Sequence, residues 1–181
     1  MPKPSSAKIY GLYDTSIGLL SLSSEKGALT EVLFGNALPA QAIDEKSPVT
    51  DRAVEELEEY FAGKRKVFSV PIALKGTPFQ KRVWQALLDI AYGQRCSYKD
   101  IALKIGSPLA YRAVGMANHN NPISIIVPCH RVVGTNGSLT GYGGGLPLKA
   151  MLLNLEQQHV SQQNAAAVHS TLFDADLNQK R

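Results

Sequence analysis

Residues 97–118, "SYKDIALKIGSPLAYRAVGMAN", decide the fold of the second half of the chain. Ser97 and Asp100 stand three residues apart, which is the spacing of a capping box at the start of a helix. Gly106 ends that helix, and the Ser-Pro pair after it begins a second one that runs to the end of the stretch. A helix, a tight glycine turn and another helix have the spacing of a helix-turn-helix.

One more helix signature precedes this stretch. Thr77 is the expected cap, Pro78 takes the first helical position and Gln80 reaches back to the cap. One apolar face follows at helical spacing and ends near Gly93: Phe79, Val83, Trp84, Leu87 and Leu88. Three helices in series are therefore expected in this half of the chain.

The first half has a different pattern. Its first 36 residues alternate short apolar runs with turn residues, which predicts two or three antiparallel strands. Residues 47–64, "SPVTDRAVEELEEYFAGK", carry a helical apolar stripe that stops at Gly63. Residues 66–74, "KVFSVPIAL", predict one more strand or an extended segment, with Pro71 favouring a sheet edge. The expected fold class is α+β, with a small antiparallel-sheet domain before a helical one.

These patterns divide the chain into three parts. We expect an N-terminal α+β domain over 1–75 and a C-terminal domain over 76–156. Within the second, "ISIIV" at 123–127 is a buried strand-like run, and a short last helix begins at Pro147. The polar tail 157–181 is rich in Gln and Ala, and we expect it to be poorly ordered or loosely helical.

The positive charge lies in the second part. Residues 1–75 carry 9 Lys+Arg against 10 Asp+Glu, a net charge of −1, whereas 76–156 carry 8 against 3, a net charge of +5. A basic helix-turn-helix favours a nucleic-acid partner, and a solvated basic face is the alternative. The helix that follows Gly106 is thin, because Ala110, Ala113 and Gly115 leave it few long side chains. It either packs tightly inside the domain or approaches a DNA groove.

The expected location follows from segments that the sequence lacks. No apolar run approaches the roughly 20 residues that span a bilayer, and "MPKPSSAKIYG" has no secretory apolar core. We expect no membrane contact and a reducing compartment, the cytoplasm or, in a eukaryote, the nucleus. A disulfide between Cys96 and Cys129 is not expected there. Two cysteines in unrelated contexts also make a poor zinc site, so no metal is expected.

Residues 125–137, "IIVPCHRVVGTNG", place Cys129 between a proline and His130-Arg131. A free thiol has a pKa near 8.5 and is only a few per cent thiolate at neutral pH. An adjacent imidazole and guanidinium raise that fraction or take the proton, so Cys129 is a candidate nucleophile. Cys96 reads as inert core. Glu156 is a candidate to orient His130, although a helix-end glutamate is more often simply exposed.

The same residues resemble the signature region of the O6-alkylguanine-DNA alkyltransferases. The resemblance is carried by "RAVG", "NP", "PCHRV" and "GY.GG", in this order within 112–156, and by "GTPFQKRVWQALLDIAYGQRCSYKDIA" at 76–102, with weaker likeness over 8–74. Proteins of this family remove alkyl groups from guanine in DNA by transferring them to their own cysteine. The resemblance implies an RNase H-like N-terminal domain and a winged helix-turn-helix-like C-terminal domain.

It also implies a role for each matching residue. Cys129 is the alkyl acceptor, His130 activates it through a bound water, and Glu156 polarises that histidine. Asn121 braces the turn that carries the cysteine, and Tyr98 donates a proton or hydrogen bond to the flipped guanine. The implied DNA-binding residues are Arg112, which fills the gap left in the base stack, with Ala113, Gly115, Tyr98, Ser97 and Arg131, the last of which also braces the active-site region. The implied base pocket contains Tyr142, Gly143, Val132 and Val127.

The implied activity is direct DNA repair in which each molecule is used once. The expected partner is double-stranded DNA carrying O6-alkylguanine, with O4-alkylthymine as a second substrate, and the expected state is a monomer without cofactors. Three alternatives remain: a non-catalytic alkyltransferase-like protein, a cysteine hydrolase and a sequence-specific helix-turn-helix regulator. The first class replaces the acceptor cysteine, the second releases product repeatedly, and the third binds one DNA sequence far better than others.

Overall fold

The computed structural model describes residues 8–178, without the side chains of 163–178. Residues 1–7 and 179–181 lie outside the described residues. They belong to the start of the expected N-terminal domain, which includes most of the stretch examined for a secretory signal, and to the end of the expected tail. The described chain opens with β1 (Ile9–Thr15), β2 (Gly18–Glu25) and β3 (Ala28–Phe34). They form an antiparallel sheet in the order β1-β2-β3, as predicted.

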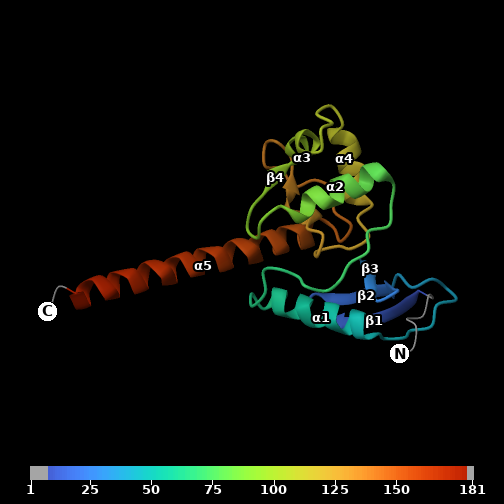
Figure 1. Cartoon of the computed structure of the whole chain (residues 1–181), viewed down its shortest axis with the longest axis horizontal. Coiled ribbons are helices and arrows are strands. Elements are labelled where there is room, and N and C mark those ends of the chain that lie inside the picture. The colour runs from blue at the N-terminus through green and yellow to red at the C-terminus, as the bar shows by residue number, and fades with distance from the viewer. Residues whose placement is uncertain (1–7, 179–181) are drawn as a thin grey trace.

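Helix α1 (Pro48–Phe61) packs along this sheet (Figure 1). Its capping box is formed by Ser47 and Thr50, and its buried face contains Leu57 and Tyr60. The predicted helix is therefore confirmed, because its apolar stripe at helical spacing has a sheet to cover.

The segment after α1 crosses to the second half as extended chain. Leu29 of β3 donates its N–H to the carbonyl of Pro71 (2.8 Å) and accepts from the N–H of Ala73 (2.8 Å). Only an isolated bridge between Leu29 and Ile72 forms in this part of the described chain. Of the two expectations for residues 66–74, the extended segment is the one observed.

Three helices follow in series, α2 (Pro78–Leu88), α3 (Tyr98–Lys104) and α4 (Tyr111–His119). Both predicted capping boxes are present, at Thr77 and at Ser97. The indole N–H of Trp84 donates to the carbonyl of Ala117 (2.8 Å) and ties α2 to α4. Helix α4 begins later than predicted, because residues 107–110 form a turn before it.

The strand-like run predicted over 123–127 is buried, as expected, but it does not form a strand. Ile123 forms a bridge with Val32 of β3, but Ile125 has a φ of 71°, which turns the chain instead of extending it. The N–H of Ile126 then bonds to the carbonyl of Ser124 (2.8 Å) across this turn. The run is apolar because it is buried, and its β-branched residues gave a strand pattern without a strand.

The turn leads into a short 3-10 helix, η1 (Cys129–Arg131). Directly after it, β5 (Val132–Val133) pairs in parallel with β4 (Cys96–Ser97). The candidate nucleophile therefore lies between a tight buried turn and a strand pair, in a backbone that is fixed on both sides.

The last helix, α5 (Leu146–Asn178), is much longer than predicted. It begins inside the C-terminal region and then leaves the body of the molecule (Figure 1). No glycine or proline follows Pro147, so nothing in the sequence ends the helix near Glu156. Just beyond Glu156, His159 accepts or donates a bond with the hydroxyl of Tyr92 (3.1 Å). Within residues 8–178, no helix is both long and apolar enough to cross a membrane.

Candidate active site

Cys129 is held by an amide side chain. Its residue is 5% exposed, and the Nδ2 of Asn121 donates to its Sγ (3.1 Å) and to the carbonyl of Val127 (2.8 Å). The Oδ1 of Asn121 accepts from the N–H of Ile123 (3.1 Å). Asn121 therefore binds both ends of the buried turn and the sulfur, which fits the bracing role that the family resemblance implies for it.

The thiol itself is weakly acidic in this setting. Burial raises the pKa of Cys129, and the hydrogen bond from Asn121 and the charge of Lys149 only partly oppose this effect. The resting group is therefore mainly the neutral thiol, and a base must take its proton before the sulfur can act as a nucleophile.

The neighbouring histidine has the geometry of such a base. The Nε2 of His130 lies 3.0 Å from the Oε1 of Glu156, and both side chains are buried. Burial acts to raise the pKa of Glu156, but hydrogen bonds and charges from His130 and Arg131 prevail and hold it at about 2. Glu156 is thus a carboxylate and only accepts, so the hydrogen of His130 is on Nε2.

The second ring nitrogen of His130 is left as a proton acceptor. Burial lowers the pKa of His130, which keeps the ring neutral, and a neutral ring protonated at Nε2 has a lone pair at Nδ1. Among the described residues, this buried Nδ1 has no hydrogen-bond partner. An unpaired buried acceptor on the residue next to Cys129 is what a general base requires, either directly or through one water.

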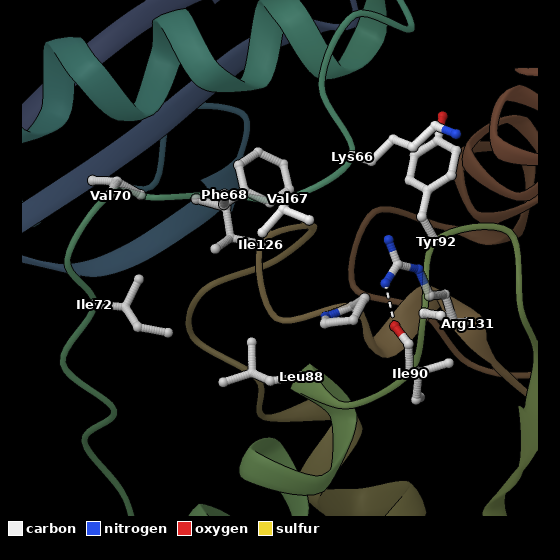
Figure 2. A pocket seen from close by; sticks show the side chains of 12 residues that line it. Lys66, Val67, Phe68, Val70, Ile72, Leu88, Ile90, Tyr92, Ile126 and Arg131 are labelled. Atoms are coloured by element: carbon white, nitrogen blue, oxygen red, sulfur yellow. Dashed lines mark hydrogen bonds between the residues drawn. The ribbon is translucent and has the colours of Figure 1, made fainter.

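Arg131 lies in the interior. Its residue is 6% exposed, and its guanidinium donates to both carboxylate oxygens of Glu156 (2.9–3.1 Å) and to the carbonyl of Ile90 (2.5 Å). Figure 2 shows this last bond beside a cavity of about 350 Å³, with Tyr92 next to the guanidinium. The bracing role expected for Arg131 fits this position, whereas a buried guanidinium is not available to a DNA phosphate.

Two site residues were missed by the sequence reasoning. The Nζ of Lys149 is buried and donates to the carbonyls of Val132 (2.6 Å) and Thr140 (2.8 Å), which joins α5 to both ends of the segment 132–140. Tyr60 of α1 donates to the Oε1 of Glu156 (2.7 Å). Lys149 precedes Glu156 by two helical turns on one face, a signal that the sequence does contain. Tyr60 lies within the helical apolar stripe predicted over 47–64, and that pattern indicates only a core position.

Two cavities open beside these residues. Cys129 lines a cavity of about 260 Å³ with Phe34 of β3, Asn121 and Gly143. The second cavity, of about 280 Å³, is lined by six residues and shares His119 with the first: Tyr98, Tyr111, Gly115, His119, Thr140 and Gly141. A cysteine, a tyrosine and the glycine-rich loop 141–145 therefore surround adjoining spaces at the surface of one domain.

The other expected pocket residues contribute in a different way. Val127 and Val132 are fully buried and are not among the described residues that line either cavity. Their carbonyls accept the hydrogen bonds from Asn121 and Lys149, so they act through the backbone. Tyr142 is buried, with its ring 6.4 Å from that of His130.

The outer face of α4 carries the expected DNA-contacting residues. Arg112 and Ala113 are exposed, and Gly115 is half-buried against the ring of Tyr98. The guanidinium of Arg112 lies over the ring of Tyr111 (5.8 Å). Ser97 is different, because it is buried and its hydroxyl bonds to Asp100 as the cap of α3. Its position is explained by helix capping.

The fold and the site together define a DNA-binding type of protein whose helix-turn-helix flanks a buried cysteine, histidine and glutamate. Residues 78–158 match the family "6-O-methylguanine DNA methyltransferase, DNA binding domain", and residues 8–74 match its "ribonuclease-like domain".

Individual proteins give the same result. A methylated-DNA–protein-cysteine methyltransferase of Methanosarcina barkeri is 44% identical over 83% of this chain and 98% of its own. The constitutive enzyme of that name in Bacillus subtilis is 46% identical over 82% of this chain and 94% of its own. The crystal structure of Mycobacterium tuberculosis OGT in complex with DNA superposes with a TM-score of 0.77, at 47% identity, over 83% of this chain and 93% of that one.

The chain belongs to the methylated-DNA–protein-cysteine methyltransferase family. The resemblance and the α+β fold class predicted from the sequence are both confirmed.

Proposed function

We propose that this protein repairs alkylated DNA by transferring the alkyl group from O6-alkylguanine to Cys129. The observation that carries the proposal is the buried thiol beside a neutral histidine whose free Nδ1 has no other partner among the described residues. A membership in this family, with a DNA-binding domain over 78–158, supports DNA as the partner. O4-alkylthymine is a second substrate of the same chemistry.

The proposed reaction is a single displacement. The thiol proton of Cys129 passes to Nδ1 of His130 through one water, and the carboxylate of Glu156 stabilises the imidazolium that forms. The sulfur then attacks the alkyl carbon, a carbon–sulfur bond forms, and the bond from that carbon to guanine O6 breaks. The electron pair stays on the guanine, which takes up a proton with help from the hydroxyl of Tyr98.

The base must leave the duplex for this reaction, since its O6-alkyl group cannot reach a buried sulfur inside the stack. Helix α4 is thin enough to approach the minor groove, and Arg112 on its exposed face fills the vacated space. The cavities that contain Tyr98 and Cys129 receive the flipped base and its alkyl group. A monomer can carry out each of these steps. Its DNA substrate lies in the cytoplasm or, in a eukaryote, in the nucleus.

Repair by one protein molecule is expected to stop after one event. The product is a thioether, which has no electrophilic carbonyl for water to attack, so the thiol is not regenerated. With methylated duplex in excess, restored guanine should reach one equivalent per active protein, and intact-mass spectrometry should show one added methyl group on the peptide that contains Cys129. Many repaired lesions per protein without a covalent mass change would instead favour a hydrolase or a glycosylase.

Arg112→Ala is expected to slow repair of duplex DNA about tenfold or more, while repair of the free alkylated base changes little. The reason is that an extrahelical base costs a few kcal/mol, which a cation in the stack offsets and a free base never incurs. Single-turnover rates on both substrates measure the difference. Arg82→Ala, which removes an exposed charge from α2 of the same domain, is the matched control. Equal losses on both substrates would assign Arg112 to chemistry or folding.

A further inference from the structure

Tyr60 brings a hydroxyl from the N-terminal half into the active site. It belongs to α1, within the residues that match the ribonuclease-like domain, and it is fully buried. Its hydroxyl lies 2.7 Å from the Oε1 of Glu156 and 3.3 Å from the Nε2 of His130. Three aromatic rings surround it, with centroids 5.5–5.8 Å away: Phe61, Phe68 and Tyr92. The hydroxyl therefore has a fixed position.

The direction of these bonds follows from the charge of Glu156. A carboxylate only accepts, so Tyr60 donates its proton to Oε1. Its oxygen then keeps lone pairs, and the Nε2–H of His130 points at a carboxylate oxygen with the phenol oxygen beside it. The 2.7 Å bond is short and charge-assisted, whereas the 3.3 Å contact is long, so the main partner of Tyr60 is Glu156.

Glu156 is fixed by donors from four residues in three parts of the chain. Its Oε1 accepts hydrogen bonds from Tyr60, His130 and Arg131. Its Oε2 accepts hydrogen bonds from Arg131 and from the N–H of Gly93 (2.8 Å). The donation from Tyr60 holds Oε1 in line with the imidazole and withdraws part of its negative charge. Both effects act on His130 without any contact between Tyr60 and the substrate.

We propose that Tyr60 is a positioning residue for the transfer reaction, through which the N-terminal domain sets the orientation and the basicity of His130. The inference rests on the proposed function, in which His130 accepts the thiol proton of Cys129. If the proposal is right, the ribonuclease-like domain contributes a residue to the transfer chemistry, in addition to the residues of the DNA-binding domain.

Other ionisable groups also face this pair, and none of them replaces the bond from Tyr60 to Oε1. The titratable and charged groups around His130 and Glu156 are Tyr60 from α1, Tyr92 after α2, Cys129 and Arg131 from η1, Tyr142 before α5, and Lys149 on α5. Burial and the positive charges of Arg131 and Lys149 lower the pKa of His130. The carboxylate of Glu156 raises it.

The sign of the expected change follows from the stronger of the two Tyr60 contacts. Tyr60→Phe removes a donor from Glu156, so the carboxylate stabilises the imidazolium more strongly and the pKa of His130 rises. Loss of the longer contact to Nε2 acts in the opposite direction but is the weaker effect. His130 must be neutral to accept a proton, so the acidic limb of the transfer rate against pH should move upward by about one pH unit.

The experiment compares single-turnover transfer from methylated duplex across pH in wild type, Tyr60→Phe and Tyr13→Phe. Tyr13 is the matched control, because it is also buried and donates to a carboxylate on α1, at Asp51 (2.7 Å), away from the active site. Both variants are expected to lose some stability, but only Tyr60→Phe should shift the acidic limb. An unshifted limb, or equal shifts in both variants, would overturn the proposal.

Imidazole ¹⁵N NMR separates this inference from the proposed function. The pKa of His130 is expected to be higher in Tyr60→Phe than in wild type and unchanged in Tyr13→Phe, and this measurement needs no DNA. If wild type shows no transfer but the pKa of His130 still responds to Tyr60, the proposed function fails while the coupling stands. If wild type transfers normally and the pKa is unchanged, the inference fails alone.

Discussion

Cys129→Ser is expected to abolish alkyl transfer, with a rate reduction on the order of 10³-fold or more. A serine hydroxyl is a far weaker acid than a thiol, and the buried site around Cys129 already raises the pKa of the thiol itself. His130 cannot therefore produce a useful fraction of alkoxide. Intact-mass spectrometry after incubation with methylated duplex should show no added methyl group.

Two comparisons complete this test. Binding of Cys129→Ser to methylated DNA should persist, because the exposed face of α4 is unchanged. Cys96→Ser should transfer at close to the wild-type rate, since burial raises the pKa of Cys96 to about 11 and Cys96 is not among the described residues that line the cavity of Cys129. A mass gain of one methyl group in Cys129→Ser would exclude Cys129 as the acceptor.

Glu156→Ala is expected to lower the free energy of unfolding by about 3–5 kcal/mol. The substitution leaves the guanidinium of Arg131 buried without its counter-charge and removes the acceptor of His130 and Tyr60. Urea denaturation measures the loss. Glu59→Ala is the control, because Glu59 forms an exposed ion pair with Arg65 and should cost less than about 1 kcal/mol. Similar losses in the two variants would contradict a structural role for Glu156.

The same substitution has a pH signature. The pKa of Glu156 is lowered from 4.5 to about 2 in the folded protein, so its stabilising effect is fully present above pH 4.5 and is lost as the pH falls toward 2. The difference in unfolding free energy between wild type and Glu156→Ala should therefore narrow as the pH falls over that range.

Local sequence signals correctly predicted the helices whose first and last residues carry recognisable capping or terminating residues. The capping boxes at Thr77 and Ser97 and the glycine turn at Gly106 placed α2 and α3 correctly, because caps satisfy the first N–H groups of a helix wherever it lies. Residues 123–127 were misread as strand-like, because their apolar run reflects burial, whereas the positive φ of Ile125 turns the chain within the run.

The site shows the same division. The motif around Cys129 pointed to His130, and Glu156 was named as the candidate to orient it. The contact between the two is nevertheless made only by the fold, across 26 positions. Tyr60 is 96 positions from Glu156, and its spacing on α1 is equally that of a core residue. Its hydroxyl function depends on what the helix packs against, and the sequence of α1 does not contain that information.

The burial of Cys129 also bears on how long an unused molecule stays competent. A protein that reacts once is lost just as surely to an oxidant or a stray electrophile in solution as to a DNA lesion. Such reagents react with the thiolate. The sulfur of Cys129 reacts slowly with them because it is mainly protonated, buried and hydrogen-bonded to Asn121. The burial that makes Cys129 depend on His130 for activation therefore also slows the inactivation of protein molecules that have not yet met a lesion.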